Sequence, residues 1–405
     1  VVEFLHRLST GLRPQAEAEL RVLQRTKQQF LGSSPGGDLP IVHGWDQQFY
    51  TAIAKAQATD HRASVISNYL PLNQCLDGLY MLVERLFGTT VRNAAMAPGE
   101  SWSPDVRKLE VIHVDDGPLG YIYLDLHPRP RKFHHSAQYI IRNWRRPPNG
   151  EPQLPHVAIV CNFAKGKHDP PRLQHQDLEA LFHEFGHAMH SLLSKNIFQH
   201  LAGTRGSMDS VEVPSNLMEY FAWDYRVLKT FAKHATTGEV IPEALVNSIC
   251  KSRSMFSATD MQAQVVLSMF DQRCHNSTPP SPGGGTTDLM AEIQAAHSVM
   301  HHVPGTSHFV RFGHLVNYSA NYYSYLFARC IAAATWQSVF NEDPLDRGAG
   351  QRLRNDLLQH GGVKPASALQ DLLGGAGFES VAGGGHLPAP EPALLEIARY
   401  YPRGA

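Results

Sequence analysis

The sequence predicts an α+β fold that is mostly α-helical, and three changes of pattern along the chain carry this prediction. Helical periodicity occupies residues 1–90, short segments rich in β-branched and aromatic residues follow over 105–163, and helical periodicity returns from residue 175 to about residue 373. Helices, then a small sheet, then many helices is an order typical of the α+β class. The 405 residues are enough for two ordinary domains or one large one.

Helix-forming residues dominate the first part of the chain. RPQAEAELRVLQRTKQQF places Pro14 where the first turn of a helix tolerates proline. NQCLDGLYMLVERLFG spaces its leucines at helical intervals and ends at Gly88, a residue that commonly stops a helix. We therefore expect a helical segment before the strand-rich region.

Residues 105–163 show strand patterns. RKLEVIHV, LGYIYLDLH, AQYIIRNW and HVAIVCNF are short and are separated by turn signals such as DDGP. They predict a small antiparallel sheet of about four strands. The last of them, residues 156–163, is either an edge strand that can pair with an extended peptide or an interior strand.

Helical patterns then continue to about residue 373, interrupted by STPPSPGGGTT at 277–287. Residues 376–405 are rich in glycine and proline, which predicts a loose C-terminal tail.

The composition excludes several functions. Lys+Arg 36 against Asp+Glu 37 leaves a net charge of −1, so nothing global attracts nucleic acid. No apolar run reaches the roughly 20 residues that span a bilayer, and we see no signal or transit peptide. The five scattered cysteines have no CxxC spacing, which argues against a disulfide framework and indicates a reducing compartment. We expect no nucleic-acid partner and no membrane insertion.

Candidate metal chemistry is concentrated in LFHEFGHAMH, residues 181–190. At about 100° per residue, His183, His187 and His190 share one face of a helix. An apolar stripe lies opposite, made of Leu178, Leu181, Phe185, Ala188, Met189 and Leu192. Histidines at i and i+4 can reach one ion, and Glu184 lies beside that face as a base that need not bind the metal. The alternative is a polar, solvated helix face, which the separate apolar stripe disfavours.

A catalytic zinc needs a third protein ligand. Leu193 stands where the metzincin pattern has its third histidine, so that class is excluded. DSVEVPSNLMEYFAWDYRVL offers Glu212 and Glu219, seven residues apart and therefore on one helix face. One can bind metal while the other orients a ligand histidine, and spacing alone does not choose between them. Both could also be solvated helix residues.

These stretches together resemble the thimet oligopeptidase family of zinc metallopeptidases. FHEFGHAMH followed by VEVPSNLMEYF carries the likeness, with further support from residues 105–126, 218–228, 309–329 and 353–374. The resemblance implies one Zn²⁺ held by His183, His187 and Glu212, with Glu184 as the general base. Glu219 then becomes the candidate that orients a ligand histidine from behind.

The stretch HLVNYSANYYSY, residues 314–325, is similar to a family loop whose histidine and tyrosines face the substrate. The resemblance implies catalytic roles for His314, Tyr318 and Tyr325, with the tyrosine hydroxyls donating to the oxyanion. Taken alone, such an aromatic segment is more typical of a core. Asn317 replaces a glycine common in the family, and it adopts left-handed backbone less freely.

The resemblance implies a zincin-like fold in which residues 1–104 form part of the upper wall of a channel, 105–375 the catalytic domain and 376–405 the tail. Family members carry a longer helical region ahead of this starting point, so we expect an N-terminally truncated wall. The nearest likeness is to members that remove a short N-terminal peptide from precursor proteins imported into the mitochondrial matrix. We expect a monomeric zinc endopeptidase of that kind. The alternatives are a general oligopeptidase that degrades short free peptides and an inactive relative that binds peptides.

Overall fold

The structure is a computed structural model, and it describes residues 1–34, 37–58, 63–148, 150–165, 171–278, 285–363, 365–375, 377–381 and 385–398. The chain divides into two compact units. Unit 1 comprises Val1–His61, Ser248–Cys330 and Glu379–Ala405, and unit 2 comprises Arg62–Asn247 and Ile331–Phe378. Each unit is made of several separate segments of the sequence. The domains expected from the sequence, 1–104, 105–375 and 376–405, are each one continuous segment, and that division stays a prediction.

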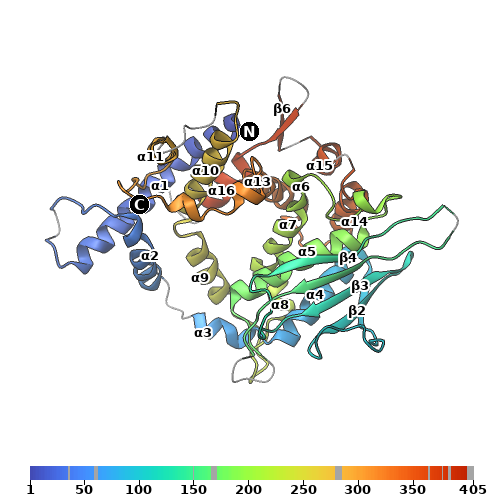
Figure 1. The fold of residues 1–405 in the computed structure, drawn as a ribbon. Coiled ribbons are helices and arrows are strands. Elements are labelled where there is room, and N and C mark those ends of the chain that lie inside the picture. Colours follow the sequence, from blue (N-terminus) through green and yellow to red (C-terminus); the bar gives the residue numbers. More distant parts are fainter. Residues whose placement is uncertain are drawn as a thin grey trace. The chain divides into compact units, whose positions relative to one another are not determined.

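Unit 2 contains a five-stranded sheet, with α4 (Leu72–Phe87) and α5 (His175–Leu193) lying along it (Figure 1). Its order is β1-β2-β3-β5-β4, formed by Thr89–Asn93, Arg107–His113, Gly117–Asp125, His156–Val160 and Ala137–Arg142. All neighbouring strands are antiparallel except β3 and β5, which are parallel. The expectation of an antiparallel sheet was therefore wrong for this pair, because the chain forms the edge strand β4 first and then returns into the gap beside β3. The short polar strand β1 was not expected.

Strand β5 is an interior strand, paired on one side with β3 and on the other with β4. Four of its five residues are buried, as a strand covered on both faces requires. Of the two alternatives for residues 156–163, the interior strand is confirmed and the edge strand is wrong. The edges of the sheet are β1 and β4.

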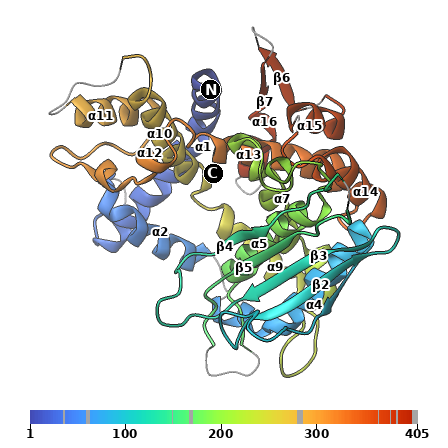
Figure 2. The ribbon, with the colours of Figure 1, turned by 45° about the vertical axis from the view of Figure 1, so that its right-hand side comes forward.

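Two helices of unit 2, α4 and α5, pack against this sheet. α4 (Leu72–Phe87) ends at Gly88, as expected, in a left-handed conformation with φ +72°. α5 (His175–Leu193) contacts β3, β4 and β5 and packs closely against α7 (Val213–Trp223) (Figure 2). The remaining α-helices of this unit in the described residues are α3 (Ala63–Ile66), α6 (Met208–Val211), α8 (Tyr225–Phe231), α14 (Arg347–Asp356) and α15 (Pro365–Leu373).

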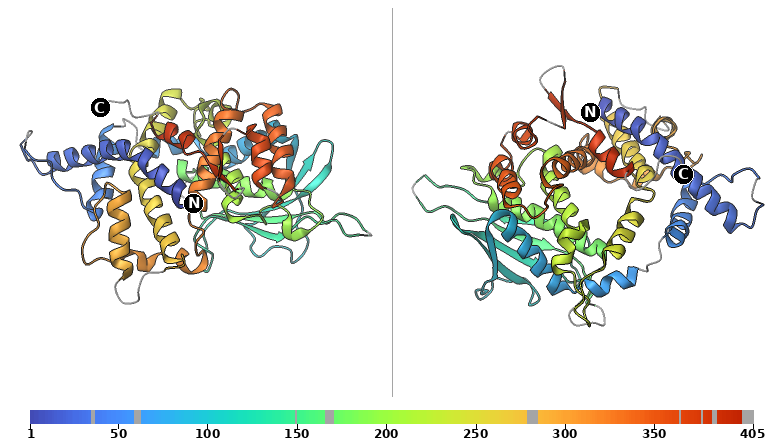
Figure 3. Two further views of the ribbon diagram at one scale, coloured as in Figure 1. Left: turned by 90° about the horizontal axis from the view of Figure 1, so that it is seen from above. Right: turned by 180° about the vertical axis from the view of Figure 1, so that it is seen from behind.

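Unit 1 is built on α1 (Val2–Phe30), which packs along α10 (Ser257–Cys274) (Figures 1 and 3). Pro14 lies inside α1 and not in a first turn, since one buried apolar stripe continues on both sides of it. The unit also contains α2 (Gly44–Ala58), α11 (Gly285–His297), α12 (His314–Asn317) and α16 (Glu391–Ala398), while α9 (Glu243–Ser254) and α13 (Ser324–Thr335) cross the unit boundary.

Much of the segment 376–405 has regular structure. β6 (Phe378–Val381) pairs with β7 (Gly385–Pro388), and α16 buries Ala393 and Ile397. Arg7 of α1 forms ion pairs with Glu379 and Glu391. The expectation of a loose tail was therefore wrong for these residues, because the apolar positions of α16 give the segment a face to bury. Most of the loop expected at 277–287 lies outside the described residues.

Among the described residues, no helix is both long and apolar enough to cross a membrane.

Candidate metal centre

Helix α5 presents two histidines on the side away from the core. It begins with a capping box between Gln174 and Asp177. The predicted apolar stripe is confirmed, since each of its six residues is almost completely buried. His183 and His187 keep 24% and 11% of their side-chain surface exposed. His190, two turns after His183 on the same helix, is buried and lies against the backbone of Gly361.

The second element of the site is α7, which crosses α5 at a glycine. A Cβ added to Gly186 would lie 2.7 Å from Ser215 Cα and 2.8 Å from the carbonyl oxygen of Pro214. Only glycine therefore lets the two backbones approach this closely. Glu212 stands immediately before α7, so the close approach at Gly186 places this carboxylate beside α5. Sequence reasoning missed Gly186, although a glycine inside an amphipathic helix is a signal of close packing.

Three side chains converge where α5 meets the start of α7. Glu212 Oε2 lies 3.4 Å from His183 Nε2 and 3.1 Å from His187 Nε2, and the three possible ligand atoms are within 4.8 Å of one another. Tetrahedral zinc ligands at about 2.0–2.2 Å from the ion lie about 3.3 Å apart. The donor set therefore fits one small divalent cation. Across the described part of the chain, no other group of His, Cys, Asp and Glu meets this geometry.

Glu212 and Glu219, which spacing along the sequence could not distinguish, make different contacts in the structure. Glu219 Oε1 lies 2.7 Å from His183 Nδ1, on the opposite side of the imidazole from Glu212. This contact favours the tautomer with its hydrogen on Nδ1, which leaves the Nε2 lone pair directed toward Glu212 and His187. This geometry favours Glu212 as the candidate ligand and Glu219 as the candidate that orients His183.

The electric field at this site favours a positive charge. Burial alone lowers the pKa of His183, but hydrogen bonds and ion pairs with Glu212 and Glu219 outweigh it and raise that pKa to about 10. Burial alone raises the pKa of Glu212, but the two histidines hold it well below its usual range. Carboxylates that stabilise a proton on the imidazole so strongly also favour a divalent cation held by the same atoms.

Glu184 lies between this group and the edge of the sheet. Its side chain is buried, and burial raises the pKa of its carboxyl despite the opposing effect of His183 and His187. The backbone of Gln138 in β4 lies close to this carboxyl and has a smaller, lowering effect on its pKa. Since Gln138 is on an edge strand, Glu184 is adjacent to the edge of the sheet that β4 presents.

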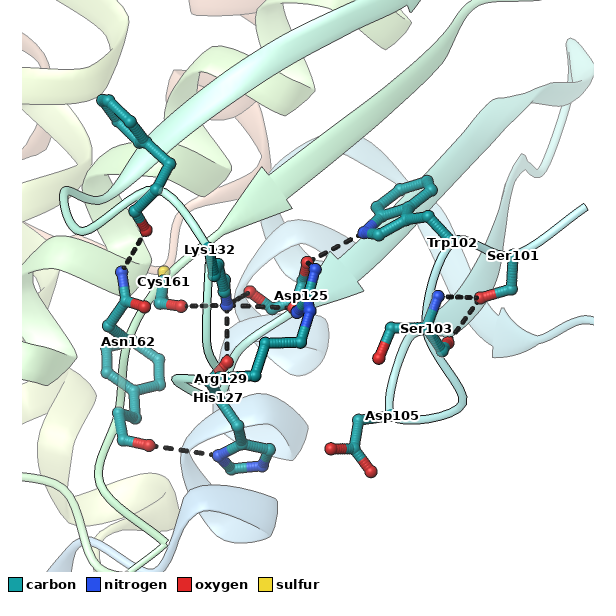
Figure 4. Close-up of polar contacts among 12 residues, drawn as sticks. Ser101, Trp102, Ser103, Asp105, Asp125, His127, Arg129, Lys132, Cys161 and Asn162 are labelled. Carbon is teal, nitrogen blue, oxygen red and sulfur yellow. Dashed lines mark hydrogen bonds and ion pairs between the residues drawn. The ribbon is translucent and has the colours of Figure 1, made fainter.

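A buried lysine fixes the segment that leads into β4 (Figure 4). The Nζ of Lys132 pairs with Asp125 Oδ1 at 2.9 Å and donates to three carbonyl oxygens at 2.5–2.8 Å, those of Asp125, His127 and Cys161. Asp125 also accepts hydrogen bonds from Trp102 and Arg129. Because Asp125 ends β3 and Cys161 follows β5, Lys132 joins the ends of two parallel strands to the loop before β4. Sequence reasoning did not single out this cluster.

His314, Tyr318 and Tyr325 lie together in unit 1. We call residues 314–325 the tyrosine loop. The ring of His314 is centred 6.0 Å from the rings of both Tyr318 and Tyr325, which stack on each other at 5.7 Å. The ring of Tyr322, which sequence reasoning passed over, lies 5.0 Å from that of His314 and 5.3 Å from that of Tyr325.

The left-handed residue of the tyrosine loop is Ala320, with φ +59°. Asn317 instead ends the short helix α12, so the concern over left-handed backbone at Asn317 was misplaced. The three candidate metal donors belong to unit 2 and the tyrosine loop belongs to unit 1. The catalytic roles of His314, Tyr318 and Tyr325 therefore stay predictions.

The geometry of two histidines one turn apart, a distant glutamate and an adjacent carboxylate is that of a metallopeptidase. A comparison with family models agrees, because residues 1–378 match peptidase family M3. The chain belongs to this family, which confirms the metallopeptidase resemblance seen in the sequence.

The chain is also similar in sequence to individual members of the family. The chain is 45% identical to mitochondrial intermediate peptidase of Arabidopsis thaliana over 399 residues, which cover 98% of this chain and 56% of that protein. It is 39% identical to human mitochondrial intermediate peptidase over 375 residues, or 92% of this chain and 52% of that protein. The chain thus spans about half the length of these curated relatives. A solved structure, PZ peptidase A with inhibitor 2, matches 68% of this chain and 42% of its own with a TM-score of 0.45 and 16% identity.

Proposed function

We propose that this chain carries the catalytic centre of a zinc endopeptidase that removes a short N-terminal peptide from precursor proteins imported into the mitochondrial matrix. The observation that carries the zinc centre is the convergence of His183, His187 and Glu212 on one small volume. The substrate and compartment are supported by 45% and 39% identity to proteins named mitochondrial intermediate peptidase.

The residues present suit zinc in particular. Two imidazole nitrogens and one carboxylate oxygen form the three-ligand set of catalytic zinc sites. A zinc ion held by these residues would supply Lewis acidity and would lower the pKa of a water molecule to about 7. Glu219, on the far nitrogen of His183, is the carboxylate that such sites use to orient and strengthen a histidine ligand.

Glu184 acts as the general base in this proposal. It accepts the proton of the water that attacks the scissile carbonyl and then returns it to the leaving amine. Its burial suits this role, because burial disfavours the charged carboxylate and so strengthens its tendency to take up a proton.

The substrate backbone binds to β4. An exposed strand edge offers main-chain donors and acceptors to an extended peptide. β4 is an edge strand, and the backbone of its residue Gln138 lies close to Glu184. A peptide added at this edge would run past the general base. The hydroxyls of Tyr318 and Tyr325 then donate to the developing oxyanion, with His314 beside them.

The test compares two substrates under two metal conditions. One substrate is a precursor protein with its N-terminal extension, and the other is that extension as a free peptide. We expect cleavage of the precursor at one bond, loss of cleavage after chelation, and recovery when zinc is restored. Full activity in the metal-free protein would refute the zinc mechanism. Faster cleavage of the free peptide and of unrelated short peptides would indicate a general oligopeptidase. Peptide binding without cleavage under every metal condition would indicate an inactive relative.

A further inference from the structure

A buried carboxylate in unit 1 holds the tyrosine loop through its main chain. Asp271 lies on α10 and is completely buried. Its Oδ1 accepts the backbone N–H of Ala320 at 3.0 Å, and its Oδ2 accepts the backbone N–H of Tyr322 at 3.0 Å. Each oxygen of one carboxylate therefore binds a different amide of the loop.

The neighbouring side chains of α10 complete the attachment. Gln272 Nε2 donates to the carbonyl oxygen of Ala320 at 2.8 Å, so Ala320 is held through both its amide and its carbonyl. The hydroxyl of Tyr322 donates to Gln264 Oε1 at 2.7 Å, two turns before Asp271. His275, one turn after Asp271, also places its Nδ1 3.0 Å from Asp271 Oδ1.

The residue held in this way has an unfavourable backbone conformation. Ala320 has φ +59°, where a Cβ crowds the backbone, and residues other than glycine seldom adopt it. Such a conformation persists only where the surroundings enforce it. Ala320 lies between Tyr318 and Tyr325, and the ring of Tyr322 contacts Tyr325. The bonds to Asp271 therefore determine how the chain passes from one candidate catalytic tyrosine to the other.

We propose that Asp271 is a positioning residue for the peptidase reaction, which it serves by holding the tyrosine loop in the conformation that groups Tyr318, Tyr325 and His314. The catalytic part of this inference rests on the proposed function. A carboxylate is specifically needed, because asparagine has one acceptor oxygen and would turn its NH₂ group toward the second amide.

The first experiment measures the loop directly. In Asp271→Asn, hydrogen exchange at the amides of Ala320 and Tyr322 should become at least about 10-fold faster, because one of the two hydrogen bonds is lost. The matched control is Glu19→Gln. Glu19 is also completely buried and accepts two backbone amides of α10, those of Ala258 and Thr259, at the other end of the helix. The control should leave exchange in the tyrosine loop unchanged. Unchanged exchange in Asp271→Asn would overturn the proposal.

The second experiment measures catalysis. Asp271→Asn should lower kcat about 10- to 100-fold with little change in KM or zinc content, because misplaced reacting groups cost rate more than binding. In a background that carries both Tyr318→Phe and Tyr325→Phe, the same substitution should cost less than about 3-fold, since the hydroxyls that Asp271 positions are then already absent. A full, additive loss in that background, or a change confined to KM, would overturn the positioning role.

The outcomes separate this inference from the proposed function. If Tyr325→Phe and Tyr318→Phe both keep full activity, the oxyanion role of the loop fails, while the exchange experiment still decides whether Asp271 holds the loop. Should Asp271→Asn fail to fold, Gln272→Leu provides a milder variant at a half-buried position. It removes only the bond to the Ala320 carbonyl, and it should accelerate exchange at the same two amides by a smaller factor. No acceleration there would count against the proposal.

Discussion

The metal centre and the tyrosine loop are held in place by different parts of the chain. In the metal centre, side chains on two regular elements meet each other, with His183 and His187 on α5 and Glu212 at the start of α7. In the tyrosine loop, the main-chain amides of Ala320 and Tyr322 donate hydrogen bonds to the side chain of Asp271, which lies on α10. One site is thus built on helices and the other on irregular backbone.

This difference has consequences for how each site responds to substitution. Helical backbone satisfies its own hydrogen bonds, so a change in one metal ligand alters that ligand and leaves the scaffold in place. Irregular backbone depends on outside partners, so the tyrosine loop should respond to changes at residues that never touch substrate. Four predictions sharpen this comparison.

The largest effect is expected in the metal centre, from Glu184→Gln and His183→Ala. Glu184→Gln should lower kcat by about 10²–10⁴-fold while zinc content stays at one ion per chain, because it removes a proton acceptor and no ligand. His183→Ala should lose both zinc and activity. Zinc content and peptide hydrolysis measured on both variants check this. Glu179→Gln is the control, because Glu179 lies on the same helix and its bond from Trp223 can be kept by glutamine. Loss of zinc in Glu184→Gln would make Glu184 a ligand and not the base.

The next effect concerns the tyrosine loop. Tyr325→Phe should lower kcat by about 10²–10³-fold with a much smaller change in KM, because a donor to the oxyanion acts mainly in the transition state. Steady-state kinetics on a single peptide substrate measure both constants. Tyr322→Phe is the comparison: its hydroxyl donates to Gln264, so its loss can act only by loosening the loop and should cost less than Tyr325→Phe. Equal losses in the two variants would assign the effect to packing of the ring cluster.

The same contrast explains what could be predicted from the sequence. The apolar stripe of α5 and its two histidines follow from helical periodicity, which depends only on neighbours along the chain. The fold class followed in the same way. The parallel pairing of β3 with β5 did not, because strand order depends on contacts between distant segments.

The candidate site shows the same limit. Spacing along one helix placed Glu212 and Glu219 on a common face, yet the choice between them needed the position of α7 against α5. Gly186 sets that position through a contact with Ser215, 29 residues further along the chain. Asp271 is likewise 49 residues from Ala320, and nothing in the local pattern of either residue indicates the bond.

An intermediate effect is expected from Glu219→Gln. Glutamine can still accept a hydrogen bond from His183 Nδ1, but without the negative charge that strengthens the imidazole as a ligand. Zinc affinity should fall by about 10–100-fold, and activity should recover at high zinc concentration. Competition with a chelator of known affinity measures the change. Glu212→Gln is the comparison, because loss of a ligand should cost more. A larger loss from Glu219→Gln than from Glu212→Gln would reverse the roles assigned to the two carboxylates.

The smallest effect, on the free energy of unfolding and on zinc affinity, is expected from Gly186→Ala. Alanine is the better helix former, so Gly186→Ala would stabilise α5 by about 1 kcal/mol if propensity alone decided. The added Cβ would instead lie 2.7 Å from Ser215 Cα, and backbone there can yield only if α7 moves. We therefore expect a net loss of about 1–3 kcal/mol in the free energy of unfolding, as overpacking typically costs. Zinc affinity should weaken too, since Glu212 moves with α7.

Urea unfolding and chelator competition on Gly186→Ala test this, with Gly44→Ala as the control. A Cβ at Gly44, the first residue of α2, meets nothing within 4 Å, so that variant should lose neither stability nor zinc affinity. If Gly186→Ala is as stable as the wild type and binds zinc equally well, the close approach of α5 and α7 does not position the third ligand. The position of Glu212 would then depend on contacts outside α5 and α7, much as the tyrosine loop depends on Asp271 of another helix.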